Sequence, residues 1–214
     1  MLLNKFFDKI YVITCDFLLE RHLYIKNHFK EKNIKFEYKS AVTSRLFKSH
    51  NTLTETEISL VNAHLHCIID AKLNKYKNIL ICEDDVSFID DVHNQFFNFI
   101  KRVPKDWDFL QLGNNADGGE WLAREKIKDN LYQFKWGTGS YCIGINSKVY
   151  DICISNFSRF DNPPDFSYYK LYKNLKAFCP ERFLADSISF RYYNNSFAHI
   201  FESTVDHSCI SNYI

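Results

Sequence analysis

The sequence predicts an α/β protein built on an open, mostly parallel sheet. Short runs rich in β-branched, aromatic and aliphatic residues alternate along the chain with longer stretches of helical period, as in strand–helix–strand units. One run, residues 78–82 (NILIC), is almost continuously apolar, which is typical of a strand buried on both faces of a parallel sheet. The 214 residues, 46% of them apolar, suffice for one sizeable core, so we expect a single domain over 1–214.

The first half of the chain contains the clearest signals. Residues 9–14 (KIYVIT) predict a strand, and Asp16 is a candidate N-cap for the amphipathic helix that follows. Thr54 and Glu57 have capping-box spacing and predict a helix to about residue 74. Further strands are expected at 36–42, 108–112, 131–136 and 140–145, and further helices at 90–103, 147–157 and 166–175.

Charge and composition exclude several classes of protein. The net charge of +1 gives no overall basic field for nucleic acid, although residues 1–50 carry ten Lys or Arg against five Asp or Glu. No run of about 18 apolar residues predicts a membrane span, and residues 1–15 do not have the shape of a signal peptide. We therefore expect a cytoplasmic protein, with peripheral contact to an anionic membrane as an open alternative for its basic first 50 residues. The seven cysteines lack disulfide or zinc-site spacing.

Three consecutive acids, Glu83, Asp84 and Asp85, follow the apolar run 78–82. Open α/β sheets bind ligands beyond the carboxyl ends of their strands, and adjacent carboxylates repel one another unless a cation offsets them. A hard divalent ion, Mn²⁺ or Mg²⁺, suits such oxygen ligands. On an extended backbone Glu83 and Asp85 would point the same way. The alternative is a solvated acidic turn that caps the next helix.

Other reactive residue types have equally plain structural explanations. No phosphate-binding glycine loop and no nucleophile elbow is present. His64 and His66 are two apart in a predicted helix, so they do not face each other, and a core or cleft position is expected for either. Cys82 and Cys142 lie in apolar runs and are expected to pack in the core.

Six segments in order resemble the motifs of glycosyltransferase family 25, which includes lipooligosaccharide and collagen hydroxylysine galactosyltransferases. They are KIYVITCDFLLERH (9–22), LTETEISLVNAHLHCIIDA (53–71), ILICEDDVSF (79–88), WDFLQLG (107–113), GTGSYCIGI (137–145) and PPDF (163–166). The resemblance covers roughly residues 8 to 190. The chain departs from the family pattern at Ser59, Leu60 and Ala63, which puts its donor preference and full activity in question.

The resemblance implies a GT-A fold, an α/β/α sandwich, and a metal-dependent, inverting transfer of a hexose to a hydroxyl of a glycan or glycoprotein. The donor by family habit is UDP-galactose. A D-x-D-like motif would hold the metal on its diphosphate, with Asp85 as the principal ligand and Glu83 and Asp84 contributing to the metal or the ribose. Asp165 is the candidate base, with Asp117 as its alternative. Candidate nucleotide contacts at the edge of the cleft are Thr14, Asp16 and His64. Candidates for stacking on the acceptor sugar are Trp121 and Tyr141, with core packing as the alternative.

Two other classes of function remain open from the sequence. A metal-dependent phosphohydrolase or nuclease could use the same acidic cluster, but it would need two metals and more ligands than the sequence places near Asp85. A catalytically silent carbohydrate-binding protein could keep the fold without turnover. Metal-dependent UDP binding distinguishes the first class from the transferase, and turnover distinguishes the second.

Overall fold

The computed structural model describes residues 2–41, 53–115, 122–193 and 196–200, with side chains up to residue 188. Its main sheet has the strand order β2-β1-β3-β8-β5-β9-β7-β6. Strands β7 and β8 run opposite to the other six, so the expected open, mostly parallel sheet is confirmed. The bounds are β1 (Lys9–Thr14), β2 (Glu37–Ser40), β3 (Asn78–Glu83), β5 (Phe109–Gln111), β6 (Leu122–Lys128), β7 (Leu131–Gly137), β8 (Cys142–Asn146) and β9 (Ala177–Cys179).

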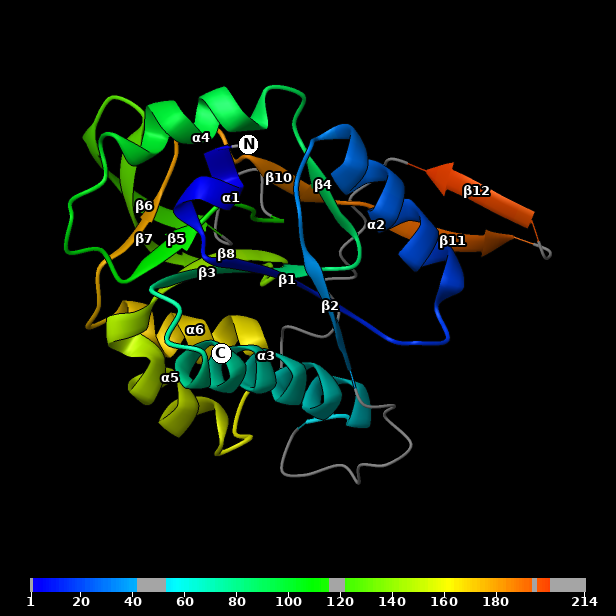
Figure 1. Cartoon of the computed structure of the whole chain (residues 1–214). Helices are drawn as coiled ribbons and strands as arrows, with labels where there is room; N and C mark the ends of the chain where they lie inside the picture. Colours follow the sequence, from blue (N-terminus) through cyan, green and yellow to red (C-terminus); the bar gives the residue numbers. More distant parts are fainter. Residues whose placement is uncertain (1, 42–52, 116–121, 194–195, 201–214) are drawn as a thin grey trace.

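Helices cover both faces of this sheet, which confirms the α/β/α layering (Figure 1). One face carries α3 (Glu55–Leu73), α5 (Tyr150–Phe157) and α6 (Pro164–Tyr172), and the 3₁₀ turn η3 (Ser147–Val149) leads into α5. The other face carries α1 (Leu2–Phe6), α2 (Leu19–Glu31) and α4 (Val92–Ile100). Alternate residues of β3 enter the two cores, with Ile79 and Ile81 on the α3 side and Leu80 and Cys82 on the α4 side.

The observed helix N-termini agree with the predicted capping residues at α3 but not at α2. Thr54 Oγ1 accepts a hydrogen bond from the Glu57 backbone N–H at 3.2 Å, and Glu57 accepts one from the Thr54 N–H at 2.8 Å, so the predicted capping box is present. The predicted cap at Asp16 is wrong, because α2 begins only at Leu19 and its N-cap residue makes no side-chain cap hydrogen bond. Helix α6 begins earlier than expected, with Pro164 at its first turn.

Several short elements had no clear signal in the sequence. Strand β4 (Val86–Phe88) pairs antiparallel with β10 (Ala185–Ser187), and β11 (Ser189–Tyr193) forms a hairpin with β12 (Ser196–Ile200). Strand β4 follows β3 after a two-residue turn at Asp84–Asp85. None of the helices in the described part of the chain is long and apolar enough to cross a membrane.

Candidate functional site

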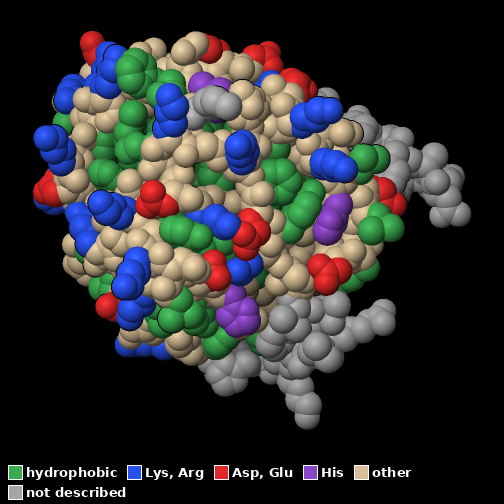
Figure 2. Space-filling model, in the orientation of Figure 1, with side chains coloured by type: hydrophobic (Ala, Val, Ile, Leu, Met, Phe, Trp, Pro, Cys, Tyr) green, Lys and Arg blue, Asp and Glu red, His purple; other side chains and the backbone are tan. Residues whose placement is uncertain are grey.

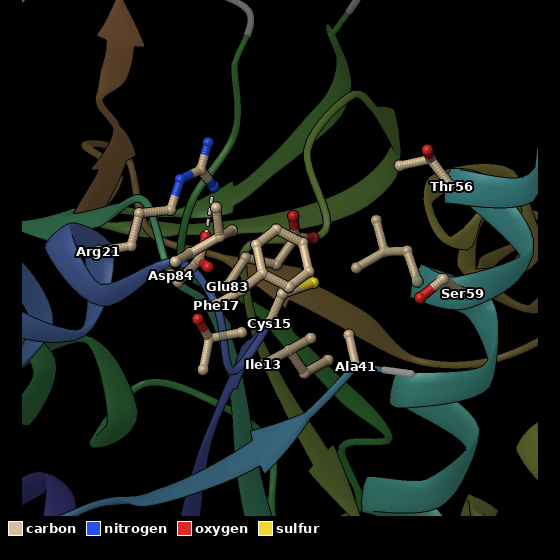
Figure 3. Close-up of a pocket in the computed structure, with 12 residues that line it drawn as sticks. Ile13, Cys15, Phe17, Arg21, Ala41, Thr56, Ser59, Glu83 and Asp84 are labelled. Atoms are coloured by element: carbon tan, nitrogen blue, oxygen red, sulfur yellow. Dashed lines mark hydrogen bonds and ion pairs between the residues drawn. The ribbon is translucent and has the colours of Figure 1, made fainter. Parts of the chain in front are cut away.

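A pocket of about 340 Å³ lies at the carboxyl ends of the parallel strands β1, β2 and β3. The segment after β1, the first turns of α3 and the end of β3 form its walls (Figure 3). Its apolar lining consists of Ile13, Cys15, Phe17, Leu18, Ala41 and Leu60. Its polar lining consists of Thr14, Arg21, Thr56, Ser59, Glu83 and Asp84. The site therefore lies where open α/β sheets bind ligands, and it offers both apolar and charged walls.

An ion pair joins helix α2 to the acidic turn inside this pocket. Arg21 Nη1 lies 2.5 Å from Asp84 Oδ1, and the two side chains are 28% and 8% exposed (Figure 3). Sequence reasoning missed Arg21, because its partner is 63 residues away and only the fold brings the two together. The only local feature that could have indicated Arg21 was its place as a basic residue in the stretch after the first strand. The guanidinium is a permanent cation in the pocket wall.

The three acids do not share one extended strand. Glu83 is the last residue of β3, while Asp84 and Asp85 form the turn before β4. The expectation that Glu83 and Asp85 project alike from a continuous strand is therefore wrong. Glu83 and Asp84 line the pocket, and Asp85 is not among its lining residues. The alternative of a solvated acidic turn also fails, because the Asp84 side chain is buried and Glu83 is largely so.

Asp85, the last residue of the acidic turn, has an unpartnered carboxyl oxygen in the described structure and a raised pKa. Its Oδ1 is buried and has no hydrogen-bond partner among the described residues. Burial, followed by repulsion from Glu83, raises the pKa of Asp85 to about 8, while Arg21 acts in the opposite direction. A second cation near this carboxyl would favour its charged form.

The acidic turn offers one or two carboxylate ligands for a divalent ion. The unpartnered Asp85 oxygen and the neighbouring Glu83 carboxylate are hard oxygen ligands of the kind Mn²⁺ and Mg²⁺ prefer. Within the described ranges no group of three His, Cys, Asp or Glu side chains could hold a metal ion. The fit is to a site with one or two protein carboxylates, the number usual for such ions when substrate phosphates supply further ligands.

A buried polar network continues from Glu83 toward helix α6. Ser140 Oγ donates to Glu83 Oε1 at 2.6 Å and lies 3.4 Å from Asp165 Oδ1, and the other Asp165 oxygen accepts from the Gly139 N–H at 2.9 Å. Since a hydroxyl has one proton, the shorter contact to Glu83 takes it. Burial raises the pKa of Asp165, an effect that the Gly139 N–H partly offsets. Asp165 is thus linked to Glu83 through Ser140.

His64 belongs to the same network from the helix side. Its Nδ1 lies 3.0 Å from the Tyr168 hydroxyl, and its Nε2 lies 3.6 Å from Glu83 Oε1. The imidazole is fully buried beneath the sheet and is not part of the pocket wall. The expectation that His64 lines the cleft is therefore corrected to a core histidine whose Nε2 faces Glu83 without a hydrogen bond.

The remaining candidates are placed as follows. Thr14 lines the pocket, and its hydroxyl is buried without a hydrogen-bond partner in the described structure. Asp16 is exposed and outside the pocket lining. Tyr141 is buried in the core, where a Cβ added at Gly113 or Gly139 would collide with its ring, so it has no free face for a sugar and that expectation is wrong.

Two predicted site residues are not described by the structure, and two predicted core thiols are. Asp117 and Trp121 lie outside the described residues. Cys82 and Cys142 are fully buried free thiols on facing strands, which confirms their expected role in packing.

Comparisons with known proteins give similarity at the level of structure only. No protein-family model matches the chain, and no curated protein matches it. The chain is similar to a glycosyltransferase involved in the glycosylation of the major capsid of PBCV-1, at 13% identity and a TM-score of 0.45, over 78% of this chain and 76% of that one. It is also similar to A197 from STIV, at 13% identity and a TM-score of 0.43, over 86% of each chain. A third similar structure is a nucleoside-diphosphate-sugar pyrophosphorylase from Vibrio cholerae RC9, at 10% identity and a TM-score of 0.41, over 80% of this chain and 72% of that one. Membership of glycosyltransferase family 25 stays a prediction.

Proposed function

We propose that this protein is a glycosyltransferase that binds a nucleotide-sugar donor in the pocket at the ends of β1 and β3. The observation that carries the proposal is the meeting of an acidic turn, a half-buried arginine and an apolar wall in one pocket at the carboxyl edge of parallel strands. A nucleoside diphosphate has the matching parts, a flat base for the apolar wall and two phosphates for the cationic side. The volume of about 340 Å³ lies within the range usual for small-molecule sites.

The donor phosphates would meet Arg21 and the acidic turn. Arg21 can bind phosphate oxygens in a bidentate manner, in exchange for its contact with Asp84. Asp85, with Glu83, would hold Mn²⁺ or Mg²⁺, which supplies Lewis-acid stabilisation of charge on the leaving diphosphate. The hydrogen bond from Ser140 holds the Glu83 carboxylate in one orientation, so less ordering is needed when the donor binds.

The acceptor hydroxyl would lose its proton to a carboxylate while it attacks the sugar in one displacement. Asp165 is the described candidate for this base, and its raised pKa suits proton transfer better than an ordinary exposed aspartate would. Asp117 remains the alternative base. The finer assignment is an inverting hexosyltransferase that uses UDP-galactose and a glycan or glycoprotein acceptor. It is supported by the motif resemblance at residues 79–88 and 163–166.

A donor-binding panel tests the proposal. The melting temperature of the protein is measured with UDP and a set of UDP-sugars, with and without Mn²⁺, for the wild type, Asp85→Ala and the control Glu125→Ala on the distant, exposed strand β6. We expect one UDP-sugar to stabilise the wild type and the control in a Mn²⁺-dependent way, and to stabilise Asp85→Ala much less. A folded protein that no nucleotide sugar stabilises would contradict the proposal. Release of phosphate from simple esters would favour a phosphohydrolase instead.

A further inference from the structure

Helix α2 presents large apolar side chains to solvent beside the pocket. Leu19 and Leu23 are 70% and 61% exposed, and Phe17, just before the helix, is 64% exposed. Isolated surface leucines are common, but here three large hydrophobic residues lie within seven positions of the chain. Because Phe17 also lines the pocket, this apolar surface begins at the pocket itself (Figure 3).

The exposed face of α2 has apolar side chains in its first half and lysines in its second half. Leu19, Leu23, Lys26 and Lys30 follow one another at helical spacings of four, three and four, so they lie within about 60° of arc on the helix. All four are exposed, while the buried side of α2 is formed by Ile25 and Phe29. We call these four residues the α2 outer stripe. Its amino-terminal half is apolar and its carboxyl-terminal half is cationic.

This arrangement matches an anionic lipid surface. Exposed leucines can enter the boundary between headgroups and acyl chains, while nearby lysines reach the lipid phosphates. Both charged residues of the stripe are lysines, while the acidic residues of α2, Glu20 and Glu31, lie outside it, and residues 1–50 carry ten basic against five acidic side chains. Figure 2 shows hydrophobic and basic side chains next to each other over the region of α2, with some acidic side chains nearby. We propose that the α2 outer stripe, with Phe17, docks the protein on a membrane that contains anionic lipids.

Docking through this surface would hold the pocket near the membrane. Phe17, Leu18 and Arg21 line the pocket and belong to the same chain segment as the stripe. If the protein transfers a sugar, as proposed above, an acceptor glycan carried on a lipid is the class that this orientation favours. That consequence rests on the proposed function, whereas binding to lipid does not.

Vesicle co-sedimentation tests the docking surface directly. Full-length protein is mixed with vesicles of phosphatidylcholine alone or of equal parts phosphatidylcholine and phosphatidylglycerol, in 0.1 M salt and without nucleotide. We expect binding to the anionic vesicles only. Lys26→Glu/Lys30→Glu is expected to weaken it at least about 20-fold, since each lysine near such a surface contributes about fivefold. Leu19→Ser/Leu23→Ser is expected to weaken it at least about tenfold.

Matched variants elsewhere on the surface serve as controls. Leu73→Ser removes a leucine of α3 that is 76% exposed, and Lys126→Glu/Lys128→Glu reverses two exposed lysines on β6. These controls, and Asp85→Ala, are expected to bind vesicles like the wild type, and circular dichroism checks that every variant is folded. Failure of the wild type to bind, or equal binding by stripe and control variants, would overturn the proposal. So would a dimer that forms without lipid and is lost in Leu19→Ser/Leu23→Ser, because the stripe would then be a subunit contact.

Discussion

Removal of Arg21 should destabilise the protein, because it leaves the buried Asp84 carboxylate without its cation. Deleting one partner of a fully buried ion pair costs about 3–5 kcal/mol, whereas exposed pairs contribute about 0–1 kcal/mol. Asp84 is 8% and Arg21 28% exposed, which places this pair between the two cases, at about 2 kcal/mol. For a chain of this length that corresponds to a fall in melting temperature of about 4–8 °C for Arg21→Ala.

The assay is thermal unfolding of Arg21→Ala, Asp84→Asn and the double variant at pH 7 without ligand. Because the neutral amide no longer needs a counter-charge, the double variant should lose less stability than the two single variants lose in sum, with a coupling energy of about 1–2 kcal/mol. The exposed pair of Lys126 and Asp129 gives the control, and Lys126→Ala should change the free energy of unfolding by less than about 0.5 kcal/mol. A melting temperature of Arg21→Ala within 1 °C of wild type, or strictly additive variants, would refute the reasoning.

Three further changes test the surroundings of the site and the local fold signals. Asp85→Asn should stabilise the ligand-free protein by at least about 1 kcal/mol at pH 8. Because the folded pKa of Asp85 is raised to about 8, the wild-type protein loses stability as pH rises from about 4 to 8, and the amide does not titrate. Urea unfolding at pH 5 and pH 8 checks that the stability gained by the variant grows with pH. Ser140→Ala should cost about 1–2 kcal/mol through the lost hydrogen bond to Glu83, measured by urea unfolding, with an unchanged value as the contrary result. Thr54→Ala should cost about 1 kcal/mol and Thr54→Ser much less, and equal thermal melts of the two would contradict a capping role.

Local chemistry was sufficient to predict the elements that carry strong periodic or capping signals. The continuous apolar run before Glu83 predicts β3, and the spacing of Thr54 and Glu57 predicts the start of α3. Strand β6 escaped prediction because most of its residues are exposed, so it has no buried face to create an apolar pattern. Strands β4, β9 and β10, each three residues long, also escaped prediction.

The candidate site was only partly predictable. Neighbouring residues in the sequence indicate where the site lies, but its side chains contact residues far away in the sequence. That a strand ends in three acids fixes where a charged site lies, since carboxyl ends of parallel strands share one edge of the sheet. Which acid faces which partner depends on residues 57 to 63 positions away, such as Ser140 for Glu83 and Arg21 for Asp84. The strand-based expectation for Asp85 failed because the turn after Glu83 ends the two-residue alternation.

The fold resolves the repulsion among the three acids by giving each a different environment. Glu83 accepts a hydrogen bond from Ser140, Asp84 is paired with Arg21, and Asp85 is half-buried with a raised pKa that favours its neutral form. These separate environments offset the repulsion that three adjacent carboxylates would otherwise exert on one another. The same division leaves Asp85 as the carboxyl with most to gain from an added cation, while Arg21 is held in the pocket until an anion competes for it. A ligand that brings both a cation and phosphates would satisfy both residues at once, which is the physical argument for proposing a metal-bound nucleotide sugar and not a simple sugar.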